Sequence, residues 1–272
     1  MKNVVAKMAD NLLNPNAPLF KQLRDNPPTW WEMLKNDPEL YIDIRKENMV
    51  MAYYQGGRVA CLTYKRGYGI SAKTHPKYVG MESDKEQEIA HSLDAQLLKK
   101  IKSNIRANYS QKSDRDIQEK LIQGECVIAH RDLYLDSEFA HRRYVKQNHT
   151  IRIDLVKIVG DEIVFEELKK INDSRLRTSA GHPEIIEQMN AYREFVLENH
   201  KVLEAYYKTL LQIKISLGLP TPPVVEIDSL HVRMEPELTI FNTYSKVTND
   251  RTKRIQAIER ELQGYDYKII KY

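Results

Sequence analysis

The chain has 272 residues, enough for one large hydrophobic core or two modest ones. Hydrophobic residues make up 42% and charged residues 29%, and no apolar run approaches the roughly 18 to 20 residues that span a membrane. The net charge of +4 is too small to indicate nucleic-acid binding by itself, and the two widely spaced cysteines, Cys61 and Cys126, have no metal-ligand spacing. We therefore expect reduced thiols, no signal peptide and a cytoplasmic location.

Residues 1–82 are predicted to form an N-terminal segment for recognition or oligomerisation. Several prolines divide residues 1–40 into brief helices and turns. Residues 41–45, 49–54 and 58–64 are rich in apolar and aromatic side chains and are separated by polar breaks, which predicts a β-meander. Its tyrosines and basic residues either bind nucleic acid or simply pack and solvate the sheet, and the sequence leaves both readings open.

Residues 83–112 are predicted to form a linking helix, with a helix proper over 83–108. Its apolar stripe comprises Ile89, Leu93, Leu97, Leu98, Ile101 and Ile105. The third region, residues 113–272, opens with a shorter helix over 113–123. Ser113 is the expected N-cap of that helix, and Gly124 is its expected end.

Strands are predicted next at 127–129 and 133–140, followed by a β-hairpin over 151–169. Gly160-Asp161 suits the hairpin turn because glycine accepts positive φ. Counting outward from that turn places Asp154 opposite Glu167, and directly opposed residues in antiparallel strands share one face. Lys169 lies on the same face because side chains alternate along a strand.

The remainder alternates between helices and strands. Helices are predicted over 183–199, 201–217 and 250–262, and strands over 224–227, 238–244 and 267–270. Strands that alternate with helices favour an α/β fold, in which helices flank a mixed central sheet. The N-terminal β-meander and the long helix would be extensions of that core.

The facing acids of the hairpin resemble the PD-(D/E)XK nuclease superfamily. Asp154 stands on one strand and Glu167-Leu168-Lys169 on the next, with Ile153 in place of the proline that names the motif. Gln188 and Tyr192 in the following helix resemble the QxxxY motif of the exonuclease-type branch. The resemblance covers roughly residues 113–245 and implies a restriction-endonuclease-like core.

The resemblance also implies roles for individual residues. Asp154 and Glu167 would bind Mg²⁺ or Mn²⁺, and Lys169 would assist the attacking water. Gln188 and Tyr192 would support the site. Glu119, in the preceding helix, and Glu138, in the preceding strand, compete for the place of a further acid. The residues expected to contact phosphate are Arg175, Arg177 and Arg152.

The function expected from these residues is metal-dependent hydrolysis of nucleic acid, with DNA favoured over RNA, in a prokaryotic cytoplasm. Membrane partners are not expected, and a homodimer would suit cleavage of both strands. Two alternatives remain open. One is a nucleic-acid-binding protein that keeps the nuclease fold without hydrolysis. The other is an assembly protein, in which the hairpin charges form an ordinary cross-strand cluster.

Overall fold

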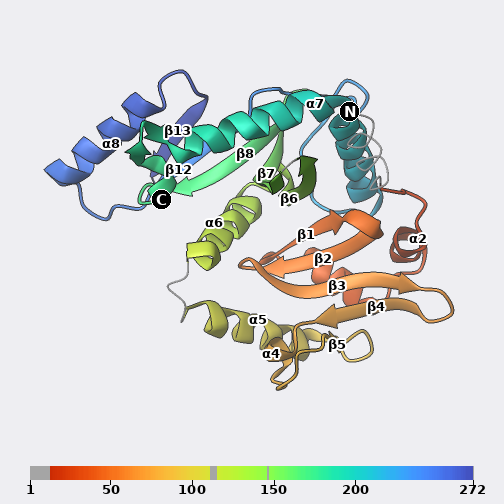
Figure 1. Cartoon of the computed structure of the whole chain (residues 1–272). Coiled ribbons are helices and arrows are strands. Elements are labelled where there is room, and N and C mark those ends of the chain that lie inside the picture. The colour runs from red at the N-terminus through yellow and green to blue at the C-terminus, as the bar shows by residue number, and fades with distance from the viewer. Residues whose placement is uncertain (1–12, 111–114, 146, 272) are drawn as a thin grey trace.

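The chain forms a mixed α/β fold with two large β-sheets, seen in a computed structural model that describes residues 13–110, 115–145 and 147–271 (Figure 1). Two short strands, β9 (Thr178–Ala180) and β10 (His182–Pro183), form a separate pair. The first sheet holds residues from the N-terminal part of the chain, and the second holds residues from the C-terminal part. Helix α6 (Arg115–Ala129) contacts strands of both sheets. Within the described ranges, no helix has the length and apolar character needed to cross a membrane.

The N-terminal sheet is antiparallel, with strand order β1-β2-β3-β4-β5. Its strands are β1 (Leu40–Arg45), β2 (Met49–Tyr54), β3 (Gly57–Lys65), β4 (Gly69–Thr74) and β5 (Gln87–Glu88). The predicted meander is confirmed, and two further strands extend it. Short helices precede it, as predicted: α2 (Pro18–Asp25) and α3 (Thr29–Asn36), which bury Phe20 and Trp31.

The predicted linking helix is confirmed only in its second half. After α4 (Pro76–Val79), helix α5 spans Ala95–Ser110, because the Asp94 side chain accepts a hydrogen bond from the Leu97 amide at 2.8 Å and caps the helix there. Ile89 was predicted on the helical stripe. It is buried instead beside the sheet, where its N–H donates to the Ala72 carbonyl at 2.7 Å.

Helix α6 continues through Gly124, so the predicted end at that glycine is wrong, and so is the predicted strand over 127–129. The reason for the glycine is tertiary. A Cβ at Gly124 would lie 3.2 Å from both the Gly56 nitrogen and the Tyr41 ring, so the glycine allows α6 to approach the β2–β3 turn closely. The predicted N-cap, Ser113, lies outside the described residues.

The second sheet has the order β13-β12-β8-β7-β6, with β11 also paired to β8. Its strands are β6 (Tyr134–Val145), β7 (Gln147–Val159), β8 (Glu162–Lys170), β11 (His231–Val232), β12 (Glu237–Asn242) and β13 (Tyr267–Lys271). β6, β7 and β8 are antiparallel, whereas β12 runs parallel to β8 and β13. The sheet is therefore mixed, as predicted.

The predicted hairpin is confirmed with its register. Gly160 has φ +66 in the turn, and the pairing runs from Val159↔Glu162 to Leu155↔Glu166. The strand predicted at 133–140 is also confirmed and extends further as β6. The strand predicted over 224–227 is wrong. That proline-flanked stretch is irregular, and β11 follows it at His231–Val232.

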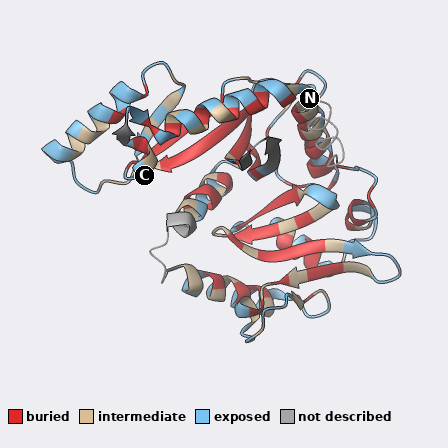
Figure 2. Ribbon diagram, in the orientation of Figure 1, coloured by how far each residue is buried: buried red, intermediate tan, exposed pale blue. Residues whose placement is uncertain are grey.

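Two predicted helices, over 183–199 and 201–217, are one helix, α7 (Glu184–Ser216). Asn199 and His200 interrupt the apolar pattern but do not stop the helix. Asn199 is buried, and its side-chain amide donates to the Phe195 carbonyl at 2.8 Å. After β12, helix α8 (Asn249–Glu261) matches its prediction. Figure 2 shows β8 buried beneath α7, while α8 is largely exposed.

The hydrophobic core is continuous between the two sheets. One cluster of buried side chains includes Trp31 and Leu62 of the N-terminal part as well as Phe165 and Tyr207 of the C-terminal part. Phe139 contacts Phe165 edge-on, with ring centroids 5.8 Å apart, beneath α7. The two sheets therefore share one core.

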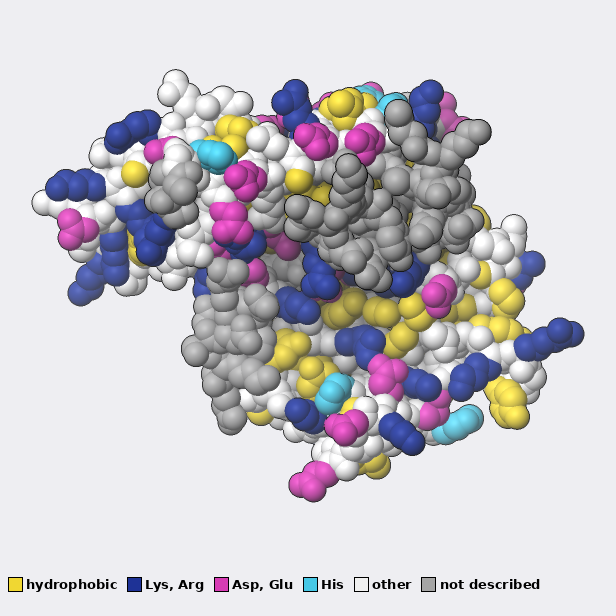
Figure 3. All heavy atoms as spheres, in the orientation of Figure 1, with side chains coloured by type: hydrophobic (Ala, Val, Ile, Leu, Met, Phe, Trp, Pro, Cys, Tyr) yellow, Lys and Arg dark blue, Asp and Glu magenta, His cyan; other side chains and the backbone are white. Residues whose placement is uncertain are grey.

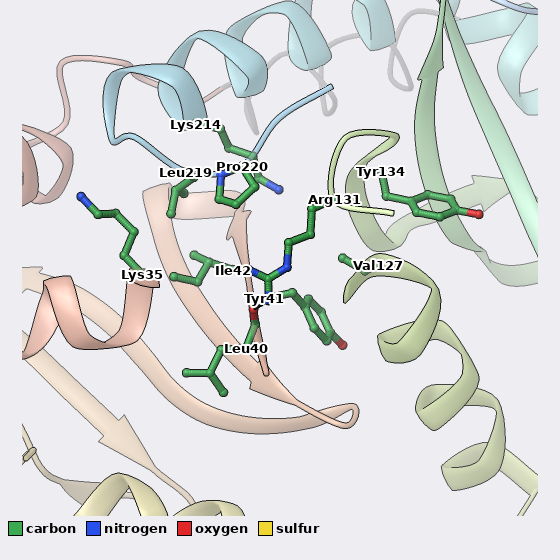
Figure 4. Close-up of a pocket in the computed structure, with 10 residues that line it drawn as sticks. All are labelled: Lys35, Leu40, Tyr41, Ile42, Val127, Arg131, Tyr134, Lys214, Leu219 and Pro220. Atoms are coloured by element: carbon green, nitrogen blue, oxygen red, sulfur yellow. Dashed lines mark hydrogen bonds between the residues drawn. The ribbon is translucent and has the colours of Figure 1, made fainter. Parts of the chain in front are cut away.

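Polar contacts also cross the seam between the sheets. Arg131, in the loop after α6, reaches the backbone of β1, and its guanidinium donates to the Leu40 carbonyl at 2.7 Å (Figure 4). A buried ionic cluster lies further along β1. Arg45 donates to Asp43 at 2.8 Å and pairs with Asp136 of β6, and Lys214 of α7 lies 3.5 Å from Asp43.

Candidate active site

A cleft of about 1280 Å³, counted to its open mouth, gathers nearly all the residues predicted for the site. It is lined by Glu119, Lys120, Gln123, Glu138, Ala140, Arg152, Ile153, Asp154, Glu167, Lys169, Arg175, Gln188 and Tyr192. These come from α6, β6, β7, β8, α7 and the short helix η2 (Ser174–Leu176). Arg177 is the exception. It is exposed just after η2 and does not line the cleft.

The pairing of β7 with its two neighbouring strands is interrupted at Asp154. The ladder to β8 ends at Leu155↔Glu166, and the ladder to β6 omits the position between Ser137↔Leu155 and Phe139↔Ile153. Glu138 occupies that gap with φ +50, a conformation that is uncommon outside glycine. Strained backbone of this kind concentrates at functional sites.

Two hydrogen bonds replace the missing ladder at Asp154. The Asp154 carbonyl accepts from the buried side-chain amide of Gln123 in α6. Its carboxylate accepts from the Leu168 amide of β8 at 2.8 Å. Both the backbone and the side chain of Asp154 are therefore fixed by neighbouring elements.

The Asp154 and Glu167 carboxyl groups lie together, as the hairpin register predicts. Burial, followed by the charge of Glu167, raises the pKa of Asp154 to about 7, although Lys169 and the Leu168 amide oppose the shift. Two acids this close disfavour joint ionisation unless a positive charge is added between them.

The two oxygens of Glu167 have different surroundings. Glu167 is 2% exposed, and its Oε1 accepts from the Lys169 ammonium and, at 2.7 Å, from the Gln188 amide. Oε2 is buried and has no hydrogen-bond partner among the described residues. A buried polar atom without a partner is costly, so an unpaired carboxylate oxygen beside a second carboxyl group marks a place suited to a cation.

Gln188 and Tyr192 act from one face of α7, as their spacing predicts. Gln188 donates to Glu167 and also lies 2.5 Å from the Tyr192 hydroxyl. The Tyr192 hydroxyl donates to the Arg152 carbonyl on β7. The pair thus ties α7 to both strands that carry the acids.

Glu119 also reaches the site, from α6. Burial raises the pKa of Glu119, and the nearby charges of Lys169 and Arg175 oppose that shift. Arg175 donates to Glu119 at 3.2 Å and to Asp173 at 2.7 Å. Arg175 therefore clamps the η2 segment to α6, and a phosphate would have to compete with two carboxylates for its guanidinium.

The cations at the mouth of the cleft are more accessible. Arg152 is exposed on β7. Lys120 of α6 pairs with Glu138 at 3.2 Å, but both side chains are more than 40% exposed, so water screens this pair. Glu138 is thus engaged with Lys120 at the mouth of the cleft.

The neighbouring acid, Glu166, faces the other side of the sheet. It is fully buried and is held by Lys157 at 3.1 Å, by Lys268 at 3.0 Å and by the Tyr134 hydroxyl at 2.9 Å. Burial raises the pKa of Glu166, but the charges of Lys157 and Lys268 and the hydrogen bond from Thr239 outweigh it and lower the pKa. Glu166 is therefore saturated with partners, whereas Glu167 is not.

The residues of the cleft fit a hard divalent cation of the Mg²⁺ type. Such a cation prefers carboxylate oxygens and keeps several of its waters, so Asp154 and Glu167 provide a sufficient protein contribution. No group of three or more His, Cys, Asp or Glu side chains is arranged to hold a metal within the described parts of the chain.

Sequence reasoning missed Gln123 and Asp173. Gln123 lies one turn after Glu119 on α6, and this four-residue spacing placed it on the same face. Nothing in the sequence shows that its amide would hold the Asp154 carbonyl, because that contact joins distant segments. Asp173 holds Arg175, and its pKa falls to about 2 because the hydrogen bonds from Arg175 outweigh its burial.

Comparisons with known proteins give this chain no family. No family model matches the sequence, and no curated protein and no solved structure is significantly similar to it.

Proposed function

We propose that the protein is a metal-dependent nuclease of the PD-(D/E)XK type that hydrolyses DNA. The observation that carries this proposal is the unpaired Oε2 of buried Glu167, beside the Asp154 carboxyl group and the Lys169 ammonium. The mixed sheet with helices on its faces is consistent with a restriction-endonuclease-like core. The Gln188–Tyr192 pair that supports Glu167 agrees with the exonuclease-type motif.

Asp154 and Glu167 would hold Mg²⁺ or Mn²⁺ in this proposal. When bound, the ion supplies an acidified water and neutralises charge on the phosphate. It would also provide Glu167 Oε2 with the partner that it lacks and offset the repulsion between the two carboxylates.

The chain's own residues would divide the remaining tasks. Lys169 orients the attacking water or stabilises the charged transition state from its buried position. Gln188 fixes Glu167, and Gln123 fixes the Asp154 backbone, so the acids are held before substrate arrives. Arg152 and Lys120, which line the cleft, would contact the phosphate backbone of DNA.

The test is a cleavage assay with supercoiled, linear and single-stranded DNA, and with RNA, in Mg²⁺ or Mn²⁺ and then in EDTA. We expect cleavage that EDTA abolishes. Asp154→Asn and Lys169→Met should each lower the rate by about 100-fold or more, since each removes a group that acts directly on the reaction. Glu162→Gln, a carboxylate change at the partly exposed start of the same strand β8, is the matched control and should leave the rate unchanged.

Each result has a definite meaning. Cleavage that persists in EDTA, or in folded Lys169→Met protein, would overturn the proposed mechanism. Salt-sensitive DNA binding without cleavage would instead favour the alternative of a binding protein that keeps the fold without hydrolysis.

A further inference from the structure

The end of the β3–β4 hairpin is an exposed aromatic and basic surface, separate from the cleft. It contains Tyr64, Lys65, Arg66, Gly67 and Tyr68, all of them exposed. Tyr68 is 90% exposed, although a tyrosine ring carries enough apolar area to favour burial. Dark-blue and yellow side chains project at the right end of Figure 3, where Figure 1 places this loop.

The backbone holds this end in a defined turn. The Tyr68 amide donates to the Lys65 carbonyl at 3.0 Å, and Gly67 and Gly69 both have φ +83, which only glycine adopts readily. Gly67 has open space around it, with no atom within 4 Å of a Cβ built there. The turn thus presents Tyr68 outward and leaves room in front of it.

A groove of about 570 Å³ lies between this hairpin end and the segment after β5. Lys65, Tyr68, Ile70 and His91 contribute to its lining. The acid in it, Glu88, is occupied: its carboxylate accepts from the Ser71 hydroxyl and from the Ala72 amide at 2.8 Å. Partial desolvation opposes these bonds, but together with nearby Lys73 they stabilise the Glu88 carboxylate and lower its pKa. The groove therefore offers an apolar and aromatic lining from Ile70 and Tyr68, the ammonium group of Lys65, and a carboxylate whose oxygens already accept hydrogen bonds from the protein.

We propose that this hairpin end binds an unpaired nucleotide of single-stranded nucleic acid. Tyr68 would stack on the base, and Lys65 and Arg66 would contact the flanking phosphates, a combination that recognises single strands without reading their sequence. The hairpin belongs to the N-terminal sheet, whereas the catalytic cleft belongs to the second sheet. The inference rests on the proposed function in one respect, namely that nucleic acid is the ligand of this protein.

Binding is measured in EDTA, so that no cleavage is needed, by fluorescence anisotropy of a labelled oligothymidylate of roughly 30 nucleotides, longer than the site size of one binding module. Tyr68→Ala should weaken binding roughly 5- to 100-fold, the range found for loss of one stacking contact, while Tyr68→Trp should retain it. The double variant Lys65→Ala, Arg66→Ala should reduce the slope of log affinity against log salt by about 1.4, because it no longer neutralises two phosphates of a single strand.

Matched controls lie nearby, on α4 and just after it. Lys77→Ala removes an exposed cation of the same sheet region, and Met81→Ala removes an exposed apolar side chain. Both should bind like the original protein. A second readout is photocrosslinking of 5-iodouracil oligonucleotides followed by peptide mapping, which should identify Tyr68.

The outcomes separate this inference from the proposed function. Affinity within about two-fold of the original for Tyr68→Ala, a smaller loss than one stacking contact predicts, would overturn it, as would crosslinks that map elsewhere. Binding of an acidic peptide to this end, with no binding of oligothymidylate, would also overturn it. Loss of cleavage in Lys169→Met with unchanged oligothymidylate binding would support both ideas. Absence of cleavage in every protein, with Tyr68-dependent binding intact, would overturn the proposed function alone.

Discussion

At the scale of single residues, Asp154 is held in a place that disfavours its charged form. Its pKa of about 7 in the folded protein, against an ordinary value of 3.8, means that the folded state binds a proton more strongly than the unfolded state does. The contribution of Asp154 to the free energy of unfolding is therefore fully present at low pH and is lost as the pH rises from about 4 to 7. The cause is burial, followed by the neighbouring charge of Glu167.

Asp154→Asn should consequently stabilise the metal-free protein at pH 8. We expect a gain of about 1 to 3 kcal/mol in the free energy of unfolding in EDTA, less than the roughly 4 kcal/mol that the full pKa shift represents. The gain should be small near pH 4, where Asp154 is protonated in the folded state and about half protonated in the unfolded state. Urea denaturation at the two pH values measures it. Adding Mg²⁺ should stabilise the original protein and not the variant. A gain from Asp154→Asn that is equal at both pH values would contradict the raised pKa of Asp154.

At the scale of elements, the position of α6 determines the shape of the cleft. This helix carries Glu119 and Gln123, and it rests against the β2–β3 turn through Gly124. Gly56 in that turn has φ +77 and would meet the Lys120 backbone if it carried a Cβ. Two glycines from distant segments thus permit one close contact between the N-terminal sheet and helix α6.

Gly124→Val should push α6 away from this turn. We expect a loss of about 2 kcal/mol in unfolding free energy from overpacking, together with lower cleavage activity because Gln123 would move away from Asp154. Glu125→Val is the matched control, since it places the same β-branched residue at the next, exposed helical position. Thermal denaturation and the cleavage assay test both expectations. Valine favours the helical conformation more than glycine does, so helix propensity alone would not destabilise Gly124→Val. A loss no larger than that of Glu125→Val would therefore contradict the role of the close contact.

At the scale of the whole molecule, a buried ionic cluster links the two sheets. Asp43 is 1% exposed and Asp136 is 3% exposed, and Arg45 bridges them. Burial raises the pKa of Asp136 to about 6, although Arg45 opposes the shift. The cluster joins β1 to β6 within the shared core. The stability of both sheets therefore depends on each buried carboxylate having a positively charged partner.

Arg45→Met should therefore destabilise the entire protein. Removing one partner leaves buried carboxylates without compensation, which costs about 3 to 5 kcal/mol. Arg58→Met breaks a partly exposed pair with Glu86 and should cost less than about 1 kcal/mol. Denaturant unfolding compares the two variants. Similar losses of unfolding free energy in both would show that the buried cluster contributes no more to stability than an exposed ion pair.

The original protein should unfold in a single transition, because its core is continuous between the two sheets.

The sequence by itself determined those features that depend on local order. The turn at Gly160 fixed the hairpin register, and that register chose Glu167 over the adjacent Glu166 as the partner of Asp154. Alternation then placed Lys169, and helical spacing placed Gln188 with Tyr192. These follow from periodicity, which is a property of a short stretch of chain.

Only the tertiary structure decided features that join distant segments. Gly124 was predicted to end a helix, but it lies inside α6 and allows a close contact with the β2–β3 turn. Arg175, which is predicted to contact phosphate, donates hydrogen bonds to Glu119 and Asp173. The Gln123 side chain donates to the Asp154 carbonyl, at the position where β7 is not paired with its neighbouring strands. The physical reason is that burial, hydrogen-bond partners and close backbone approach depend on which surfaces meet, and the sequence pattern of one element does not contain that information.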